Sequence, residues 1–299
     1  MQKKLHYLYV FAAGALWGII SLFLKPLLDM GFSQMQTVTL RCLLAAAVLG
    51  IYMLLKDKSL FRFRLRDIWC FLGTGLLSLL FFSVCYFYSM TYNGVCVAVI
   101  LLYTSPVFVM LLSLLLFKDK ITYKKLIAVA LTIIGCVLVS GVAGGQSIGA
   151  VGIVLGICSG LGYALYSIFS RYALQKNYHS MTISFYTFLF CGLGCLPFAK
   201  PVSMVASLTP KSILLVVGLG VVCCVLPYLF YTKGLESVDN TRASVIVAVE
   251  PVVASLIGVF VYRESVTPLK IAGVVLVLAA VLICSTASAA PQNADEKGA

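Results

Sequence analysis

Residues 234–267 decide the fold: they read GLESVDNTRASVIVAVEPVVASLIGVFVYRESVT, and residues 89–122, SMTYNGVCVAVILLYTSPVFVMLLSLLLFKDKIT, follow the same pattern at an offset of 145 with no gap. Both stretches are apolar, both carry one central proline (Pro106 or Pro251), and both end on a charged pair shortly before a threonine. A fixed offset between two such stretches is the signature of an internal duplication. The chain is therefore predicted to contain two copies of one structural unit.

The whole chain has the composition of a membrane protein. Of its 299 residues, 62% are hydrophobic and only 11% are charged, which is about half the charged share of a soluble domain. Because one bilayer crossing takes about 20 apolar residues, a soluble globule is excluded and an all-α polytopic fold with ten transmembrane helices is expected. The expected spans are 7–27, 34–55, 67–90, 95–117, 123–141, 148–172, 180–199, 211–231, 241–261 and 268–286.

The two copies are predicted to be inverted relative to each other. Each copy holds five spans, an odd number, so the second copy must enter the membrane from the opposite side. At an offset of 146 the first span also aligns with the sixth, so that Trp17 meets Tyr163. The expected boundaries are a first repeat at 1–141, a short external link at 142–146, a second repeat at 147–288 and a cytoplasmic tail at 289–299. Inverted repeats are typical of secondary transporters, in which one bundle rocks against another around a midplane site.

The basic residues predict the orientation in the membrane. If the N-terminus is cytoplasmic, the cytoplasmic segments hold sixteen of the 22 Lys and Arg, the outer segments hold five, and Arg41 lies inside a span. By the positive-inside rule, this bias predicts that both termini of a multi-pass cell-membrane protein are cytoplasmic. It also accounts for the net charge of +12, so no nucleic-acid partner is expected. The basic run at 56–66 is interpreted as a topology determinant that contacts lipid headgroups.

Two five-helix copies, each with a fourth helix that is built around a proline and ends in a charged pair, resemble the EamA-type transporters of the drug/metabolite transporter superfamily. The resemblance is carried by Ser105-Pro106 through Lys118-Asp119, by Glu250-Pro251 through Arg263-Glu264, and by Trp17-Gly18. It implies ten helices, cytoplasmic termini and transport of a small molecule by alternating access, often export of an amino acid, a related metabolite or a drug-like compound. One departure is that Ser105 stands where the second copy has Glu250, so any role of a carboxylate there belongs to one half only.

The two central prolines are expected to be hinges. Each deprives the carbonyl four residues earlier, Leu102 for Pro106 and Val247 for Pro251, of its helical hydrogen bond. Exposed backbone at the midplane is tolerated only where protein or a wet cavity satisfies it, so we expect the substrate cavity between these helices. The alternative is a packing kink in which a neighbouring threonine or serine hydroxyl bonds the carbonyl.

Two charged residues inside spans are candidate site residues. Glu250 is the only one of the ten Asp and Glu that lies deep within a predicted span, and a carboxylate at that depth marks a functional site by default. We expect it to bind a substrate ammonium or to exchange a proton; the alternative is a neutral carboxyl that bonds a helix carbonyl. Arg41 is expected to pair with a substrate carboxylate or with Glu250, or else to reach the outer headgroups.

A group of amphipathic side chains is the candidate wall of the substrate cavity. Its members are Trp17, Tyr88, Asn93, Tyr103, Tyr163, Tyr166 and Tyr228. Aromatic faces suit apolar or cationic substrates, and the alternative is ordinary helix packing. The small-residue patterns Gly14-xxx-Gly18 and Gly152-xxx-Gly156-xxx-Gly160 are expected to let helices approach each other closely.

Chemistry other than transport has little support in the sequence. The eleven cysteines lie in or near apolar runs and only two histidines are present, so no disulfide framework, metal site or cofactor is expected. No histidine or pair of aspartates lies deep within a span, which disfavours an intramembrane enzyme. A passive facilitator or channel and a non-transporting membrane scaffold remain alternatives. The sequence leaves open the substrate, the direction of transport, proton coupling, and whether the chain is a monomer or a homodimer.

Overall fold

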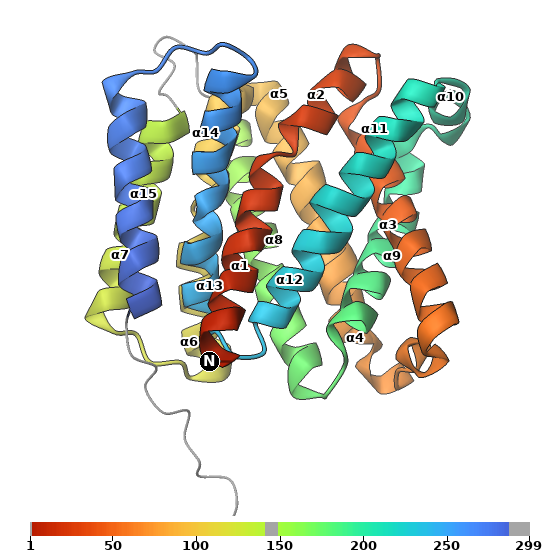
Figure 1. The fold of residues 1–299 in the computed structure, drawn as a ribbon, viewed down its shortest axis with the longest axis horizontal. Helices are drawn as coiled ribbons and strands as arrows, with labels where there is room; N and C mark the ends of the chain where they lie inside the picture. Colours follow the sequence, from red (N-terminus) through yellow and green to blue (C-terminus); the bar gives the residue numbers. More distant parts are fainter. Residues whose placement is uncertain (1, 141–148, 287–299) are drawn as a thin grey trace, which may run out of the picture.

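The computed structural model describes residues 2–140 and 149–286, and within these ranges the spans are helical apart from short turns (Figure 1). Ten helical segments are long and apolar enough to cross a membrane, from Lys4–Asp29 to Pro268–Ser285. The ten predicted spans are therefore confirmed, with ends that shift by a few residues; the largest shift is in the third span, which continues to Val95. The predicted link at 142–146 and tail at 289–299 lie outside the described residues.

The described residues form fifteen α-helices, some of which are joined within one span by short 3₁₀ or π-helical segments. The first repeat holds α1 (Gln2–Gly18), α2 (Ser21–Asp29), α3 (Gln34–Lys56), α4 (Ile68–Leu72), α5 (Phe81–Leu102), α6 (Ser105–Phe117) and α7 (Tyr123–Ser140). The second holds α8 (Ala150–Gln175), α9 (Ser180–Ala199), α10 (Pro201–Ala206), α11 (Pro210–Gly220), α12 (Leu226–Gly234), α13 (Asn240–Ile246), α14 (Glu250–Phe260) and α15 (Pro268–Thr286). The third and fourth spans meet within α5 at Gly94, whose positive φ of 78° turns the chain without a loop.

The two repeats pack through equivalent helices. The fifth and tenth spans, α7 and α15, pack against each other on the left of Figure 1, and the second and seventh, α3 and α9, pack together on the right. Between these two pairs, α1 packs on α12. In the same way α8, the helix of the second repeat that is equivalent to α1, packs on α5. The first span thus contacts the eighth as the sixth contacts the third, which is the arrangement that inverted repeats produce around an in-plane twofold axis.

The spans around this axis are interrupted at equivalent depths. A π-helical segment lies between α4 and α5 (Gly73–Leu80), and another lies between α11 and α12 (Val221–Val225). The helix also breaks before each central proline, and Pro106 and Pro251 stand in the first turn of α6 and α14, where a missing N–H does no harm. Non-α turns of this kind are frequent at functional sites.

Glycines of the first and sixth spans pack against the freed backbone. A Cβ atom on Gly14 would lie 2.6 Å from the Val247 carbonyl, and one on Gly160 would lie 3.2 Å from the Leu102 carbonyl and 2.6 Å from the hydroxyl of Thr104. The Thr104 hydroxyl itself donates to the Leu101 carbonyl at 2.6 Å. The carbonyls upstream of the prolines therefore lie beneath bare glycine backbone, and the close helix approach predicted from the Gly patterns is present.

Candidate functional site

A small cavity lies where α1, α8, α12 and the first π-helical segment meet. Its lining residues are Trp17, Ser78, Leu79, Phe82, Tyr163, Tyr166, Ser167, Tyr228 and Tyr231. Its volume is about 20 Å³, enough for roughly one water molecule. The cavity is therefore closed in this conformation, and admitting a larger molecule requires its helices to move apart.

The cavity wall is an aromatic cage built across the repeat axis. The Trp17 and Tyr163 rings, which occupy equivalent positions in the two repeats, approach each other with centroids 6.3 Å apart. Trp17 also packs edge to face on Tyr228 at 5.1 Å, and Tyr228 packs in the same way on Tyr166 at 4.9 Å. Four of the residues predicted for the wall thus lie together in the structure. Such a cage presents several π faces and suits an apolar or cationic group.

Most hydroxyl groups of the cage are already bonded to protein. The Tyr231 and Ser167 hydroxyls lie 2.7 Å apart, and the Tyr166 and Thr232 hydroxyls lie 2.8 Å apart, both at hydrogen-bond distance. The Tyr163 hydroxyl donates instead to the Oε2 atom of Glu250, at 3.4 Å. Tyr163 therefore connects the cavity to the carboxylate that the sequence singles out.

Glu250 begins α14, immediately after the helix break in the ninth span. Its bond from Tyr163 is long, and the ion pairs of residues 2–140 and 149–286 include none to this carboxylate. A Cβ atom on Gly18 would lie 2.7 Å from the Glu250 carbonyl, so α1 crosses directly over this residue. A carboxylate inside a span without a countercharge is costly, and it is available to a cation or a proton.

Three predicted residues do not line the cavity. Tyr103 has Glu250 as an electrostatic neighbour but packs against a separate apolar cluster that includes Val249 and Val252. Tyr88 is exposed on the outside of the bundle. Asn93 is buried, but its amide accepts a bond from the Gly149 N–H and donates one to the Gly149 carbonyl, so it ties α5 to the start of α8.

Arg41 lies in the interior rather than at the membrane surface. Its guanidinium has Tyr228 and the thiols of Cys42, Cys191 and Cys224 as electrostatic neighbours. Its Nε atom is buried and has no hydrogen-bond partner in the part of the chain that the structure describes, and neither Glu250 nor another carboxylate there pairs with it. Arg41 thus stands beside the aromatic cage from the α3 side. The described residues contain no group of three or more potential metal ligands.

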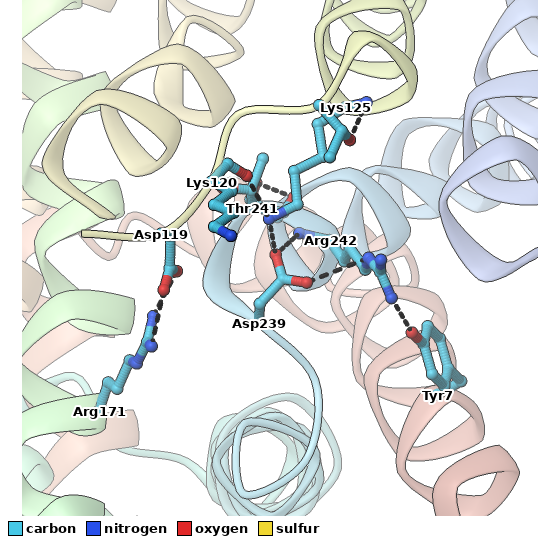
Figure 2. A network of polar contacts seen from close by, with 10 residues as sticks. Tyr7, Asp119, Lys120, Lys125, Arg171, Asp239, Thr241 and Arg242 are labelled. Carbon is cyan, nitrogen blue, oxygen red and sulfur yellow. Dashed lines mark hydrogen bonds and ion pairs between the residues drawn. The ribbon is translucent and has the colours of Figure 1, made fainter. Parts of the chain in front are cut away.

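The end of the bundle that holds the start of α1 carries a network of charged residues (Figure 2). Asp119 forms a two-pronged bond with Arg171, at 2.5 and 2.9 Å. Asp239 pairs with Lys125 at 3.0 Å and with Arg242 at 3.1 Å. The Asp119 and Lys125 pairs each join one repeat to the other, so the network clamps the two halves together at this end.

The same network reaches the first helix. Arg242 donates from Nη1 to the Tyr7 hydroxyl at 2.9 Å, as Figure 2 shows. Lys125 and Arg242 are only 8% and 6% exposed. Two of the sixteen basic residues that predict orientation are therefore buried in ion pairs instead of facing headgroups.

The opposite end of the bundle is held differently. The Lys25 ammonium lies over the Tyr262 ring, 4.1 Å from its centroid, and the Tyr262 hydroxyl donates to the Ser21 carbonyl at 2.9 Å. Glu264 pairs with Lys270 at 3.0 Å, but both belong to the second repeat and the Glu264 side chain is 53% exposed. No ion pair among the described residues joins the two repeats at this end.

Sequence reasoning missed several residues of the cavity and of the network. Tyr231 and Ser167 line the cavity, and helical spacing gives the signal that could have found them, because they follow Tyr228 by three positions and Tyr163 by four. Asp239 carried no comparable signal. It precedes α13 in a link, and its partner Lys125 is more than a hundred residues away.

Comparison with known proteins agrees with this architecture. The profile of the EamA-like transporter family matches residues 4–141 and 150–286. An uncharacterized transporter of Archaeoglobus fulgidus is 33% identical over 189 residues, 63% of this chain, and the chain covers 66% of that relative's length. An uncharacterized transporter of Clostridium kluyveri is 20% identical over 92% of this chain and 91% of its own length.

The fold is also similar to that of a protein of known crystal structure, with a TM-score of 0.77 and 17% sequence identity. The superposition covers 94% of this chain and 96% of the other chain. At this identity the likeness shows the fold. The family profile covers both five-span halves, and the chain is a multi-pass membrane protein with ten spans. This chain belongs to the EamA-like transporter family, a family of membrane transporters.

Proposed function

We propose that the chain is a secondary transporter that moves a small organic molecule by alternating access, with the aromatic cage and Glu250 as its substrate site. The observation that carries the proposal is Glu250 itself. It is a carboxylate without a countercharge in the described part of the chain, placed at a helix break and bonded to a residue of the cage. A cationic or protonatable group in the cage would face both aromatic rings and this carboxylate.

Proton coupling is the use of Glu250 that we propose. A carboxylate that binds a proton in one conformation and a cationic substrate in the other makes the two compete for one site. Such competition couples the flow of protons to the flow of substrate in opposite directions. Tyr163 supports this role, because its hydroxyl bonds one oxygen of the carboxylate and leaves the other for a ligand.

The charged ends supply the gates in this proposal. The present conformation is clamped at the α1 end by Asp119–Arg171 and Lys125–Asp239. Opening that end requires both pairs to separate. In an inverted repeat the same motion brings together the equivalent positions at the other end, where Lys25 and Glu264 stand unpaired with each other.

The membrane orientation is also a proposal. With both termini cytoplasmic, the clamped end is the cytoplasmic one and the conformation is closed toward the cytoplasm. Sixteen of the 22 basic residues support this orientation. Export, the direction that the family resemblance implies, then releases substrate at the end held by Lys25 and Tyr262.

The test is transport by the purified chain in vesicles, with and without an imposed pH gradient. A panel of small amines, amino acids and organic cations is the substrate screen. The wild type is expected to move at least one of these compounds faster when the proton gradient drives protons in the direction opposite to the compound. The Glu250→Gln variant is expected to lose this acceleration, because the amide carries no titratable proton.

The matched control is Glu236→Gln, which removes one carboxylate from an exposed pair with Lys233 and should leave the pH response unchanged. If Glu250→Gln kept the wild-type response to the gradient, Glu250 would have no part in coupling. Transport that ignores the gradient in the wild type would instead identify a passive facilitator.

A further inference from the structure

A second hollow lies outside the transport site, at the α1 end of the bundle. It has a volume of about 620 Å³ and lies between the segment at 62–67 and the turn that joins α8 to α9. Four cationic side chains and one carboxylate line it: Arg62, Arg64, Arg66, Lys176 and Asp67. The transport mechanism above uses none of them.

The local sequence explains why the arginines face this hollow. Arg62 and Arg64 have extended backbones, with φ and ψ near −80° and 130°, and together with Phe63 they line the hollow. Phe63, between them, packs inward on Phe71 at 5.3 Å and on Tyr186 at 4.8 Å. These ring contacts therefore fix the segment that carries both arginines, and the half-buried Phe63 ring itself also lines the hollow.

The segment is held in place by hydrogen bonds to the second repeat. The Tyr186 hydroxyl donates to the Phe61 carbonyl at 2.8 Å, and the Thr182 hydroxyl donates to the Leu60 carbonyl at 2.7 Å. The Arg64 N–H donates to the Tyr178 hydroxyl at 3.1 Å. The arginines are thus presented on a fixed backbone, which lowers the entropy lost when they bind a ligand.

The single carboxylate of the hollow is already occupied. Asp67 accepts bonds from the Lys176 ammonium at 2.5 Å and from the Tyr178 hydroxyl at 2.8 Å. The same contact raises the pKa of Lys176, which keeps its charge. The ion pairs of the described residues include none to Arg62, Arg64 or Arg66. An excess of positive charge therefore remains for an anion, and the fork of donors on a guanidinium matches the oxygens of a phosphate.

The surroundings place the hollow at headgroup depth. Trp69 is 40% exposed and packs on Tyr172 at 5.3 Å, beside the Lys176 ammonium. Trp and Tyr gather at the membrane–water interface. Leu65, between the arginines, is 79% exposed and offers apolar surface next to the charged groups, as an acyl chain would require.

We propose that this hollow is a binding site for the phosphate of an anionic phospholipid headgroup, held by Arg62, Arg64 and Arg66. The equivalent segment of the other repeat, residues 200–211, has no arginine and only two basic residues, Lys200 and Lys211. There the chain forms α10, flanked by Lys200, and Val202 on that helix is 87% exposed. The site therefore belongs to one leaflet only, the one at the α1 end.

Trp69 provides the measurement, because it stands next to the hollow while Trp17, the other of the two tryptophans, is buried. The full chain is reconstituted in phosphatidylcholine vesicles that contain brominated phosphatidylglycerol or brominated phosphatidylcholine, and quenching of Trp69 reports which lipid occupies the site. At about 1 kcal/mol per basic residue near an anionic surface, we expect phosphatidylglycerol to bind at least about tenfold more tightly than phosphatidylcholine.

The variant R62Q/R64Q/R66Q is expected to lose this preference. The control K58Q/K120Q/K124Q removes the same charge from exposed positions at the same end that do not line the hollow, and it should keep the preference. An equal loss in both variants, or no preference in the wild type, would overturn the proposal. If the triple arginine variant does not fold, R64Q alone should still reduce the preference about fivefold, and no reduction would count against the site.

Added glycerol phosphate separates the two sources of a phosphate group. If the lipid is the ligand, the soluble ester leaves quenching by brominated phosphatidylglycerol unchanged. Displacement of the lipid by glycerol phosphate would contradict the lipid assignment and show that the hollow takes phosphorylated solutes.

Discussion

The two ends of the bundle are related by the internal repeat, yet they are held in different ways. The equivalent positions are Asp119 and Glu264, Lys125 and Lys270, and Arg171 and Lys25. At the α1 end these positions form ion pairs that join the repeats. At the other end Glu264 and Lys270 pair within one repeat, and Lys25 lies on the ring of Tyr262.

The difference shows that similar halves occupy different states in one structure. If both ends were clamped alike, the cage between them could not open to either side. One residue strengthens the contacts at the α1 end and has no counterpart at the other end. Asp239 stands where the first repeat has Gly94, and it pairs with both Lys125 and Arg242. The asymmetry of the ends therefore rests on a few side chains and can be tested by changing them.

Removal of Asp239 should have the largest effect on stability. Asp239→Ala leaves the ammonium of Lys125 and the guanidinium of Arg242 buried without their carboxylate. We expect the free energy of unfolding to fall by about 3 kcal/mol, as read from thermal or denaturant unfolding in detergent. Glu236→Ala, which breaks only the exposed pair with Lys233, should change stability by less than about 1 kcal/mol. Equal effects of the two changes would mean that the clamp contributes nothing.

The Asp119–Arg171 pair should have the next largest effect. Asp119→Asn or Arg171→Gln removes one partner of a partly buried two-pronged bond and is expected to cost about 2 kcal/mol. The exchange D119R/R171D restores opposite charges and should recover part of the loss. At the other end, Glu264→Gln should cost less than about 1 kcal/mol because the side chain is half exposed. A loss as large at Glu264 as at Asp119 would remove the difference between the ends.

The equivalent glycines should differ by a smaller amount. A methyl group on Gly14 would meet the Val247 carbonyl and the Val249 side chain, whereas on Gly160 the nearest atom is the rotatable hydroxyl of Thr104. Gly14→Ala is therefore expected to cost about 1–2 kcal/mol, and Gly160→Ala about half as much. Unfolding of the two variants side by side checks this order. A larger loss for Gly160→Ala than for Gly14→Ala would contradict the contacts described for these two glycines.

The smallest change in stability is expected at the aromatic pair. Tyr163→Phe deletes the bond to Glu250 and should change stability by about 1 kcal/mol or less. It should nevertheless shift the pH dependence of transport, because the carboxylate loses the hydrogen bond from Tyr163. Trp17→Phe at the equivalent position touches no carboxylate and should alter the transport rate without altering its pH dependence. An equal pH shift in both variants would show that the bond from Tyr163 to Glu250 does not set the pH dependence of transport.

Much of the fold could be predicted from the sequence because hydropathy and duplication are properties of the chain alone. The ten spans and the helix breaks at Pro106 and Pro251 follow from them. The alignment of Trp17 with Tyr163 follows too, but the contact between their rings emerges only in the structure. It is harder to predict from the sequence which side of each helix faces lipid and which faces the interior. Tyr88 faces outward, and a span that is apolar on every side carries no periodicity that tells lipid from interior.

The clamp could not be predicted for a different reason. Lys125 and Asp239 are paired across both repeats, and nothing in either local sequence names the other as its partner. In the sequence Lys118-Asp119 stands out only as the charged pair that ends the repeated motif, whereas in the structure Asp119 binds Arg171 from the sixth span. Long-range pairing of charges depends on how helices dock, which the sequence pattern of a single span does not encode.

The most direct test of alternating ends is a pair of distance measurements at equivalent positions. Spin labels are placed on exposed Lys120 and Ser237 at the α1 end, and on exposed Tyr92 and Ser265 at the other end; each pair spans the two repeats and is related to the other pair by the duplication. In the D119N/R171Q variant the account predicts that the first distance lengthens while the second shortens, relative to the unmodified background. A second distance that stays unchanged, or that lengthens together with the first, would contradict alternating access by this chain.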